Sequence, residues 1–198
     1  MITFKNLTQE PPYLIFKKKY DEAYNLGQKN IEAISISSYN KKMNEVDSRF
    51  VNLKFLNHDK FIFFSNYNSP KSLAFESHDQ IAGLFFWTST NTQIRLKGKI
   101  KRCSFDFNSK YFKQRSKEKN ALAISSNQSK KVPTYENVLK KYNEVQKNED
   151  LLVCPKDWGG FSFIPYYFEF WEGHELRLNK RVVYEKNINN WQKYYIQP

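Results

Sequence analysis

Five short runs of β-branched and aromatic residues constrain the fold of this chain more than any other feature. The runs cover residues 31–40, 48–56, 60–66, 80–89 and 92–104. Residues of the Asn, Asp, His and Ser types separate them, which is typical of consecutive antiparallel strands. In the last run apolar residues alternate with polar ones, so we expect one buried and one solvent-facing side. The pattern predicts a mainly β fold, a β-barrel with peripheral helices.

A short amphipathic helix is predicted ahead of the strands. Phe16, Tyr20 and Tyr24 recur at helical spacing, and Gly27 follows as a termination signal. Residues 1–12, which precede this helix, are interpreted as a polar and flexible arm.

Three more helices are predicted at the edges of the barrel. One begins with Ser69 as N-cap and Pro70 in the first helical position. Its free N–H groups and Lys71 would attract a phosphate, although an ordinary capped helix with a solvated lysine explains the same residues. The other two helices are expected over 105–117 and from about Thr134 onward.

The C-terminal part of the chain is predicted to return to strands. Residues 154–173 are interpreted as two strands around a proline turn, and a last strand ends in "WQKYYIQP". We find no internal repeat and no low-complexity linker, so residues 1–198 are expected to form a single domain.

The stretch "FWEGHELRLNKR" (170–181) contains a concentrated group of candidate binding residues. If it is extended, Arg177, Asn179 and Arg181 share one face, because side chains alternate along a strand. Two arginines and an amide near Trp171 would suit a flat ligand that carries negative charge.

The chain is strongly basic. Lys and Arg total 32 against 20 Asp and Glu, which gives a formal net charge of +12. An excess of this size indicates an acidic partner such as nucleic acid, membrane headgroups or phosphorylated ligands. A surface simply coated with lysines explains it equally well, because the lysines are scattered.

The cysteine and histidine pattern argues against two classes of site. Cys103 and Cys154 are far apart with no Cys-x-x-Cys, and the three histidines have no metal-ligand spacing. Neither a disulfide framework nor a metal site is predicted. The sequence shows no signal peptide and no membrane-spanning apolar run, so a soluble, cytoplasmic protein is expected.

Residues that could carry chemistry occur as separate cationic points on strands and helix starts. No P-loop, dinucleotide fingerprint or Ser/His/Asp arrangement is present. Isolated cations suit one or two small phosphate-bearing ligands better than a polyanion, although each alone is more often a solvated surface charge. The candidates, with their aromatic and amide neighbours, are Arg49, Lys54, Lys71, Arg115, Arg177, Arg181, Tyr111, Trp171, Gln93 and Gln128.

The order of the motifs from about residue 30 to residue 198 resembles the pyridoxamine 5′-phosphate oxidase family. The matching stretches are "SRFVNLK", "FIFFSNYNSPK", "TQIRLKG", "YFKQR", "NQS", "DWGGF", "FEFWEG" and "RLNKR". The resemblance implies an FMN-binding split β-barrel, a homodimer with FMN at the subunit interface, and oxidation of a phosphorylated B6-type substrate by O2. No membrane partner is implied.

The resemblance also implies a role for individual residues. The FMN contacts would be Arg49, Phe50, Val51, Lys54, Phe64, Ser65, Lys71, Gln93, Gln128, Ser129, Trp171 and Arg181. The substrate contacts would be Lys54, Tyr111, Arg115, Lys119, Arg177 and Asn179, of which Arg177 and Asn179 would lie at the reacting ring.

Three positions depart from the family pattern. Pro70 replaces an arginine, Lys119 replaces a serine, and Asn179 replaces a histidine, so the flavin contacts are better preserved than the substrate contacts. Three hypotheses follow: a pyridoxamine and pyridoxine 5′-phosphate oxidase, a related FMN oxidase of another heteroaromatic (phenazine-type) metabolite, or a non-enzymatic binding protein. The last would be a flavin carrier or a nucleic-acid-binding domain, and the nucleic-acid version lacks any recognition motif.

Overall fold

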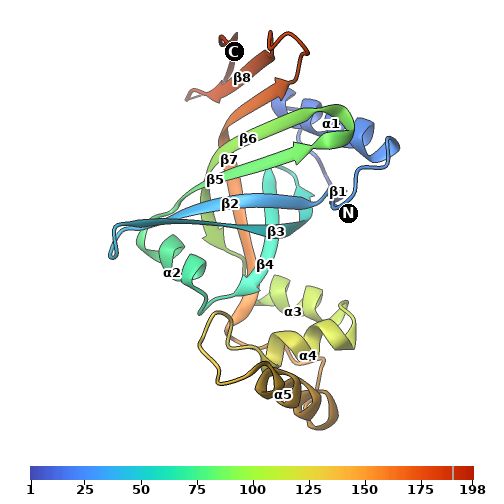
Figure 1. Ribbon diagram of the computed structural model, residues 1–198, viewed down its shortest axis with the longest axis vertical. Coiled ribbons are helices and arrows are strands. Elements are labelled where there is room, and N and C mark those ends of the chain that lie inside the picture. The colour runs from blue at the N-terminus through green and yellow to red at the C-terminus, as the bar shows by residue number, and fades with distance from the viewer. Residues whose placement is uncertain (189) are drawn as a thin grey trace.

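Six antiparallel strands close a barrel in the order β3–β2–β5–β6–β7–β4 (Figure 1). The computed structural model describes residues 1–188 and 190–198. The barrel strands are β2 (Ala33–Asn40), β3 (Glu45–Asn57), β4 (Lys60–Asn66), β5 (Gln80–Trp87), β6 (Thr92–Arg102) and β7 (Trp158–Glu172). Strand β4 pairs with both β3 and β7, and this closes the barrel. Along the segments paired with β4, strands β3 and β7 therefore have no unpaired edge. The predicted mainly β barrel with peripheral helices is confirmed.

Three further strands extend the sheet beyond the barrel. Strands β8 (Lys180–Lys186) and β9 (Trp191–Tyr195) continue it outward from β7. Strand β1 (Thr3–Lys5) pairs in parallel with the end of β3. The prediction of a free arm over residues 1–12 is therefore wrong, because Ile2 is buried in the core and its N–H donates to Tyr20 Oη at 3.0 Å.

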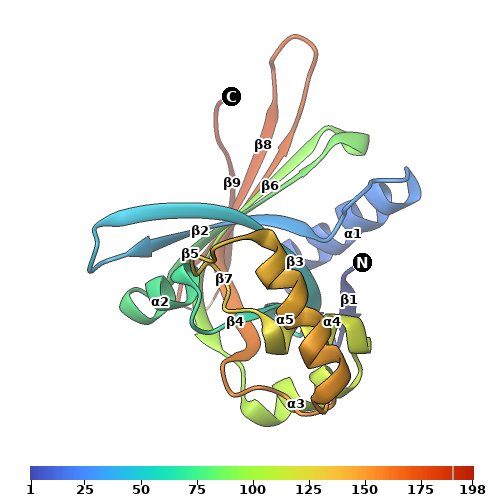
Figure 2. The same ribbon diagram turned by 60° about the horizontal axis from the view of Figure 1, so that its bottom comes forward.

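Helices lie on the outside of the barrel and at one end of it. They are α1 (Pro11–Asn25), α2 (Pro70–Ser77), α3 (Phe105–Lys113), α4 (Lys117–Ser125) and α5 (Tyr135–Asn148), with a short 3-10 turn η1 (Thr88–Thr90). Helices α3, α4 and α5 gather at one end, away from β8 and β9 (Figure 2). Helix α4 was not among the predicted helices. None of the helices in the described part of the chain is long and apolar enough to cross a membrane.

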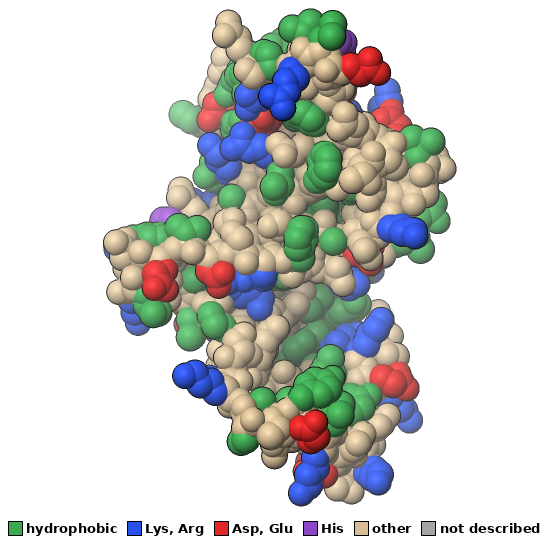
Figure 3. Space-filling view, in the orientation of Figure 1, with side chains coloured by type: hydrophobic (Ala, Val, Ile, Leu, Met, Phe, Trp, Pro, Cys, Tyr) green, Lys and Arg blue, Asp and Glu red, His purple; other side chains and the backbone are tan. Residues whose placement is uncertain are grey.

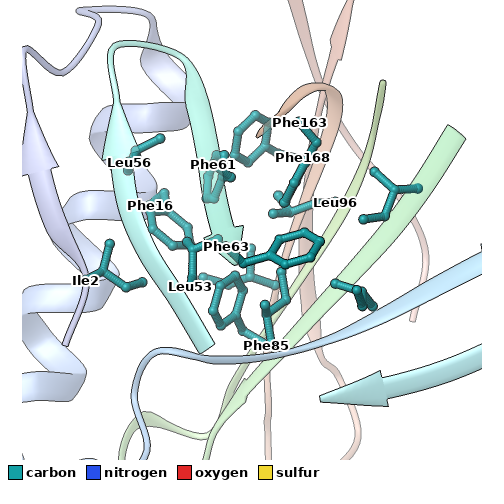
Figure 4. Packing of buried hydrophobic residues seen from close by; sticks show 14 of the residues in the cluster. Ile2, Phe16, Leu53, Leu56, Phe61, Phe63, Phe85, Leu96, Phe163 and Phe168 are labelled. Atoms are coloured by element: carbon teal, nitrogen blue, oxygen red, sulfur yellow. The ribbon is translucent and has the colours of Figure 1, made fainter. Parts of the chain in front are cut away.

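The core combines buried residues of all six barrel strands with those of α1, and it is built mainly from aromatic rings (Figure 4). Phe16 of α1 packs its ring 5.1 Å from that of Phe61 and 5.4 Å from that of Phe85. Burying one such side chain contributes about 1.5–3 kcal/mol. Helix α1 is thus fixed to the barrel by Phe16 and Tyr20 of the predicted stripe, whereas Tyr24, its third predicted member, is exposed.

Residues 158–172 form one continuous strand, not two strands around a proline turn. Pro165 lies in β7 opposite Gly98, where the register with β6 shifts. Proline lacks an N–H for the ladder and is tolerated in a sheet at such irregularities. Before Pro165 the strand pairs with β4, and after it with β8. The proline therefore marks where β7 changes partners.

Candidate active site

Most of the predicted site residues in the first 130 residues of the chain line a single cavity between the barrel and helices α3 to α5. Its volume is about 540 Å³, and the space-filling view shows a recess between the barrel and the region of α3 to α5 (Figure 3). The lining residues are Arg49, Phe50, Val51, Asn52, Lys54, Phe64, Ser65, Lys71, Tyr111, Gln114, Arg115, Ser116, Lys119, Gln128 and Trp158. The cavity thus combines candidates from β3, β4, α2, α3 and α4.

A β-bulge places Lys54 at this cavity. The pairing of β3 with β4 shifts register between Leu53 and Phe55, so Lys54 is the extra residue on β3. A bulge changes the direction of a side chain relative to regular alternation. Lys54 can therefore face the cavity while Leu53 remains fully buried in the core.

Lys71 lies at the start of α2 and is only 6% exposed. Its Nζ donates to Ser69 Oγ at 3.0 Å and to Gln128 Oε1 at 3.3 Å, and both acceptors are neutral. Burial, with a smaller effect from the charge of Arg49, lowers the pKa of Lys71 to about 8. Arg49 itself contacts Asp47 and donates to Ser38 Oγ at 2.9 Å. This end of the cavity favours an anion that would stabilise the buried ammonium.

Lys54, Arg115 and Lys119 form a second cationic group in the lining of the same cavity. Burial lowers the pKa of Lys54, Glu32 opposes that shift, and the charges of Lys119 and Arg115 lower it further. Burial also lowers the pKa of Arg115. Among the described residues, none accepts a hydrogen bond from the buried Nη1 of Arg115. A buried donor without an acceptor is costly, so this group also favours an anionic ligand.

Aromatic rings form the wall between β4, α3 and the start of β7. Phe64 stacks on Tyr111 with ring centroids 4.1 Å apart and on Trp158 at 5.1 Å. The guanidinium of Arg115 lies over the Trp158 ring, 4.3 Å from its centroid. A cation over an indole face is held electrostatically. The wall therefore orients Arg115 and offers flat apolar surface.

Three of the four remaining flavin candidates form one row across three strands. Gln93 of β6 pairs with Trp171 of β7, and Trp171 pairs with Arg181 of β8. Residues directly opposite in an antiparallel sheet project their side chains to the same face. Gln93, Trp171 and Arg181 are thus neighbours on one face of the sheet.

The predicted extended face of Arg177, Asn179 and Arg181 is wrong, because residues 174–179 form a loop before β8. Arg177 has a left-handed φ of 59°, and its N–H donates to the carbonyl of His174 at 2.9 Å. The N–H of His174 donates to Asn179 Oδ1 at 3.0 Å. Asn179 therefore closes the loop locally. Arg177, Asn179 and Trp171 line a second cavity, of about 550 Å³.

The two groups of candidates lie at opposite ends of β7. Trp158 at its start lines the first cavity, and Trp171 near its end lines the second. A strand advances about 3.3 Å per residue, so these two residues are separated by up to roughly 40 Å. Figure 1 shows β7 running from the helical end of the molecule toward β8. A single chain does not bring the predicted residues together.

Some lining residues were not among the sequence candidates. Trp158, Gln114, Asn52 and Ser116 all line the first cavity. Trp158 and Gln114 belong to the motifs "DWGGF" and "YFKQR". These motifs indicated that the two segments contribute to the site, but they did not single out Trp158 or Gln114. Ser129, a predicted flavin contact, has a left-handed φ of 68°, is exposed, and lies outside this lining.

The first cavity fits a phosphate-bearing cofactor. Five of its lining residues are lysine or arginine, and no carboxylate occurs among the described residues that line it. The unpartnered Nη1 of Arg115 and the neutral contacts of Lys71 leave hydrogen-bonding capacity for anionic oxygens.

Sequence comparisons agree with this chemistry. Residues 158–198 match the family described as the pyridoxine 5′-phosphate oxidase C-terminal dimerisation region. A pyridoxine/pyridoxamine 5′-phosphate oxidase of Hydrogenovibrio crunogenus is 34% identical, over 96% of this chain and 89% of the relative. Another, of Leptospira interrogans, is 30% identical over 94% of this chain and 88% of the relative. The chain belongs to the pyridoxine/pyridoxamine 5′-phosphate oxidase family. Enzymes of this family are FMN-dependent oxidoreductases.

Solved structures agree with the family assignment at the level of the fold. PhzG from Burkholderia lata, in complex with tetrahydrophenazine-1-carboxylic acid, has a TM-score of 0.90 at 23% identity and covers 96% of this chain and 93% of its own. A pyridoxamine 5′-phosphate oxidase-related, FMN binding protein from Nostoc punctiforme has a TM-score of 0.79 at 12% identity and covers 96% and 99%. The split barrel of the family is therefore the fold of this chain.

Proposed function

We propose that this chain is an FMN-dependent oxidase that converts pyridoxamine 5′-phosphate and pyridoxine 5′-phosphate to pyridoxal 5′-phosphate. O2 would be the acceptor and H2O2 the second product. The observation that carries the proposal is the first cavity, where described residues present five cations, no carboxylate and an unpartnered arginine N–H. A lining of this kind suits more than one phosphate group. The names of the relatives support the same reaction.

One end of the cavity would hold the phosphate of FMN. Lys71 and Arg49 supply charge there, and Ser65 and Gln128 supply polar contacts. Ser65 Oγ already donates to Gln128 Oε1 at 3.1 Å, so the two side chains are fixed relative to each other. When bound, FMN would supply the redox chemistry by taking two electrons from the substrate and passing them to O2.

The other end would hold the phosphate of the substrate. Lys54, Arg115 and Lys119 supply charge, and Tyr111 supplies a hydroxyl group. Arg115 Nη2 donates to the carbonyl of Lys119 at 3.0 Å, which leaves its Nη1 for the ligand. Two separate phosphate contacts would position one ring against the other, so that binding supplies much of the orientation the reaction needs.

The site would be completed by a second copy of the chain in a homodimer. Gln93, Trp171 and Arg181 would contact the flavin from the partner, and Arg177 and Asn179 would reach the substrate ring. This arrangement is supported by the separation of these residues from the first cavity and by the match to a dimerisation region. We expect a dimeric mass in solution by light scattering. A monomeric mass with FMN fully bound would contradict the proposal.

A second candidate keeps FMN and changes the substrate. Asn179 stands where the family pattern has a histidine, and an amide cannot carry a proton. Lys119 adds a cation where a serine is usual. These positions favour another anionic heteroaromatic ring, such as a carboxylated phenazine-type compound.

The test is a spectrum of the purified protein followed by anaerobic titration. We expect a flavin absorbance, bleached by pyridoxamine 5′-phosphate and restored by air with formation of H2O2. Bleaching only by a phenazine-type compound would support the second candidate. A flavin spectrum that neither compound bleaches would indicate a flavin carrier, and no flavin binding would overturn both oxidase proposals.

Arg115→Met, which removes the unpartnered donor, should raise the substrate KM while FMN stays bound.

A further inference from the structure

Glu169 is a fully buried carboxylate close to the row formed by Gln93, Trp171 and Arg181. It lies on β7 two residues before Trp171, and its side chain is 1% exposed. Residues two apart on a strand project to the same face. Glu169 is thus on the side of the sheet that carries this row, yet it is covered within the chain itself.

The carboxylate of Glu169 is shared between two arginines. Oε1 accepts from Arg181 Nε at 2.9 Å and from Arg181 Nη2 at 2.7 Å. Oε2 accepts from Arg95 Nη1 at 2.6 Å and from Tyr167 Oη at 3.0 Å. Each oxygen therefore has its own partners, and the oxygen that faces Arg181 is separate from the one that faces Arg95.

These contacts fix the guanidinium of Arg181. Its Nη1 also donates to the backbone carbonyl of Gln197 at 2.9 Å. A guanidinium has five N–H donors in one plane, and three are used here. Among the residues that the structure describes, none accepts from the other two N–H groups, one on each terminal nitrogen, and their direction is set by the contact with Glu169.

We propose that Glu169 is a positioning residue, which orients Arg181 so that its two free N–H groups meet the flavin. The inference rests on the proposed function, because it assumes that Arg181 contacts FMN. Glu169 would also reduce the repulsion between Arg95 and Arg181, whose charges approach the same carboxylate. It would not touch FMN itself.

The test measures FMN dissociation constants of the reconstituted apoprotein by flavin fluorescence, without any assay of turnover. Arg181→Met should weaken FMN binding about tenfold or more, as expected for loss of a charge-assisted contact. Glu169→Gln keeps the shape of the side chain and should weaken binding by a similar factor. In the Arg181→Met background, Glu169→Gln should change the dissociation constant less than about twofold, because its effect acts through Arg181.

Tyr167→Phe is the matched control. It removes a donor to Oε2, the oxygen that faces Arg95, and should leave FMN affinity unchanged.

Loss of the buried charge of Glu169 can also destabilise the fold, so thermal midpoints of the apoproteins are measured in parallel. If Glu169→Gln does not fold, Arg95→Gln with Glu169→Gln removes one cation together with the carboxylate and should show the same weakened affinity.

The outcomes separate the proposals. If Arg181→Met weakens FMN binding and Glu169→Gln in the parent does not, the positioning role is wrong while the proposed function stands. Equal effects of Glu169→Gln in both backgrounds also overturn it, because they indicate a general structural role. If Arg181→Met binds FMN like the parent, the inference falls with the assignment of Arg181. If the parent protein does not bind FMN at all, the proposed function is wrong.

Discussion

Lys71 combines burial with a positive charge, and its hydrogen-bond partners inside the protein are neutral. A buried charge without an opposite charge is unfavourable. Titratable residues with perturbed pKa values concentrate at functional sites, where a ligand can supply the missing charge. We therefore propose that the buried Lys71 at the start of α2 lowers the stability of the free protein and binds an anion that offsets this cost.

Replacing Lys71 with Ala should weaken FMN binding. A charge-assisted contact to a phosphate is worth about 1.5–3 kcal/mol, which corresponds to roughly tenfold to a hundredfold in affinity. Isothermal titration of the apoprotein with FMN would measure the change. Lys140→Ala on the exposed helix α5 is the control and should have no effect. An unchanged dissociation constant for Lys71→Ala would show that the phosphate is held elsewhere.

FMN affinity should fall at alkaline pH. Because the pKa of Lys71 is lowered to about 8 in the free protein, its ammonium form predominates below that pH and is lost above it. Only the charged form attracts the phosphate, so the FMN dissociation constant should change little from about pH 7 to pH 8 and then rise up to about tenfold per pH unit. Lys71→Arg stays charged over this range and should flatten the profile. A parent profile as flat as that of the variant would exclude Lys71 as the titrating group.

Arg177 and Asn179 should affect the substrate and not the cofactor. Arg177→Ala should lose turnover of pyridoxamine 5′-phosphate while FMN stays bound, because Arg177 is proposed to lie over the substrate ring. Asn179→His should raise kcat/KM for the same substrate by restoring a side chain that can carry a proton. Steady-state kinetics with flavin occupancy measured by absorbance would check both variants. If Asn179→His gains nothing on this substrate and loses activity on another ring, the second candidate function is favoured.

At the scale of elements, the first cavity depends on where β4, α3 and β7 place their aromatic rings. Trp158 begins β7 just after the loop from α5 and is 6% exposed. Its ring stacks on Phe64 of β4 and also contacts Arg115, which follows α3. Strand β4, helix α3 and strand β7 are distant in sequence, and together they fix the side chain of Arg115.

Removing the indole of Trp158 should loosen Arg115. A cation–π contact contributes about 0.5–2 kcal/mol, so Trp158→Leu should raise the substrate KM about twofold to thirtyfold with a smaller change in kcat. Trp158→Phe should recover part of the loss because it keeps a ring. Trp191→Leu on β9, far from this cavity, should lower the thermal midpoint without changing KM. A loss confined to kcat would argue against a role in holding the phosphate.

The strands and their order along the chain were largely predictable from sequence, because the pattern that indicates each strand lies within the strand itself. The alternation in β6 and the β-branched and aromatic runs of β2 to β5 follow directly from which side of the sheet is buried. The start of α2 was predictable because Ser69 and Pro70 are local signals. Helix α4 was missed because its sequence has almost no amphipathic pattern.

Features that depend on distant partners were not predictable. Pro165 suggested a turn, but β6 supplies a register shift that lets the strand continue. Residues 174–179 suggested a strand, but His174 and Asn179 close a loop by their own hydrogen bonds. The burial of Ile2 depends on Tyr20 and on pairing with β3. The pairing of Glu169 with two arginines required knowing which strands are neighbours.

At the scale of the whole molecule, the basic surface is not organised as a single stripe. Lys and Arg side chains are scattered over the face seen in Figure 3, with acidic groups between them. A polyanion such as nucleic acid requires a continuous basic path. The lysine and arginine side chains that are candidates for ligand binding instead line the first cavity.

The length of β7 has a genetic consequence. Because the first cavity and the Arg177 loop lie at opposite ends of this strand, a proposed dimer would build each of its two sites from both chains. Lys71→Ala, assayed at an FMN concentration near the dissociation constant of the parent, and Arg177→Ala should each lose most activity alone, yet co-expressed chains should complement each other. In a mixed dimer one site carries both lesions and the other carries none, so random assembly should restore about a quarter of the sites. Activity of the co-purified mixture, measured per bound chain, would check this. If Lys71 and Arg177 served the same site from one chain, every site in the mixture would carry a lesion and no activity would return.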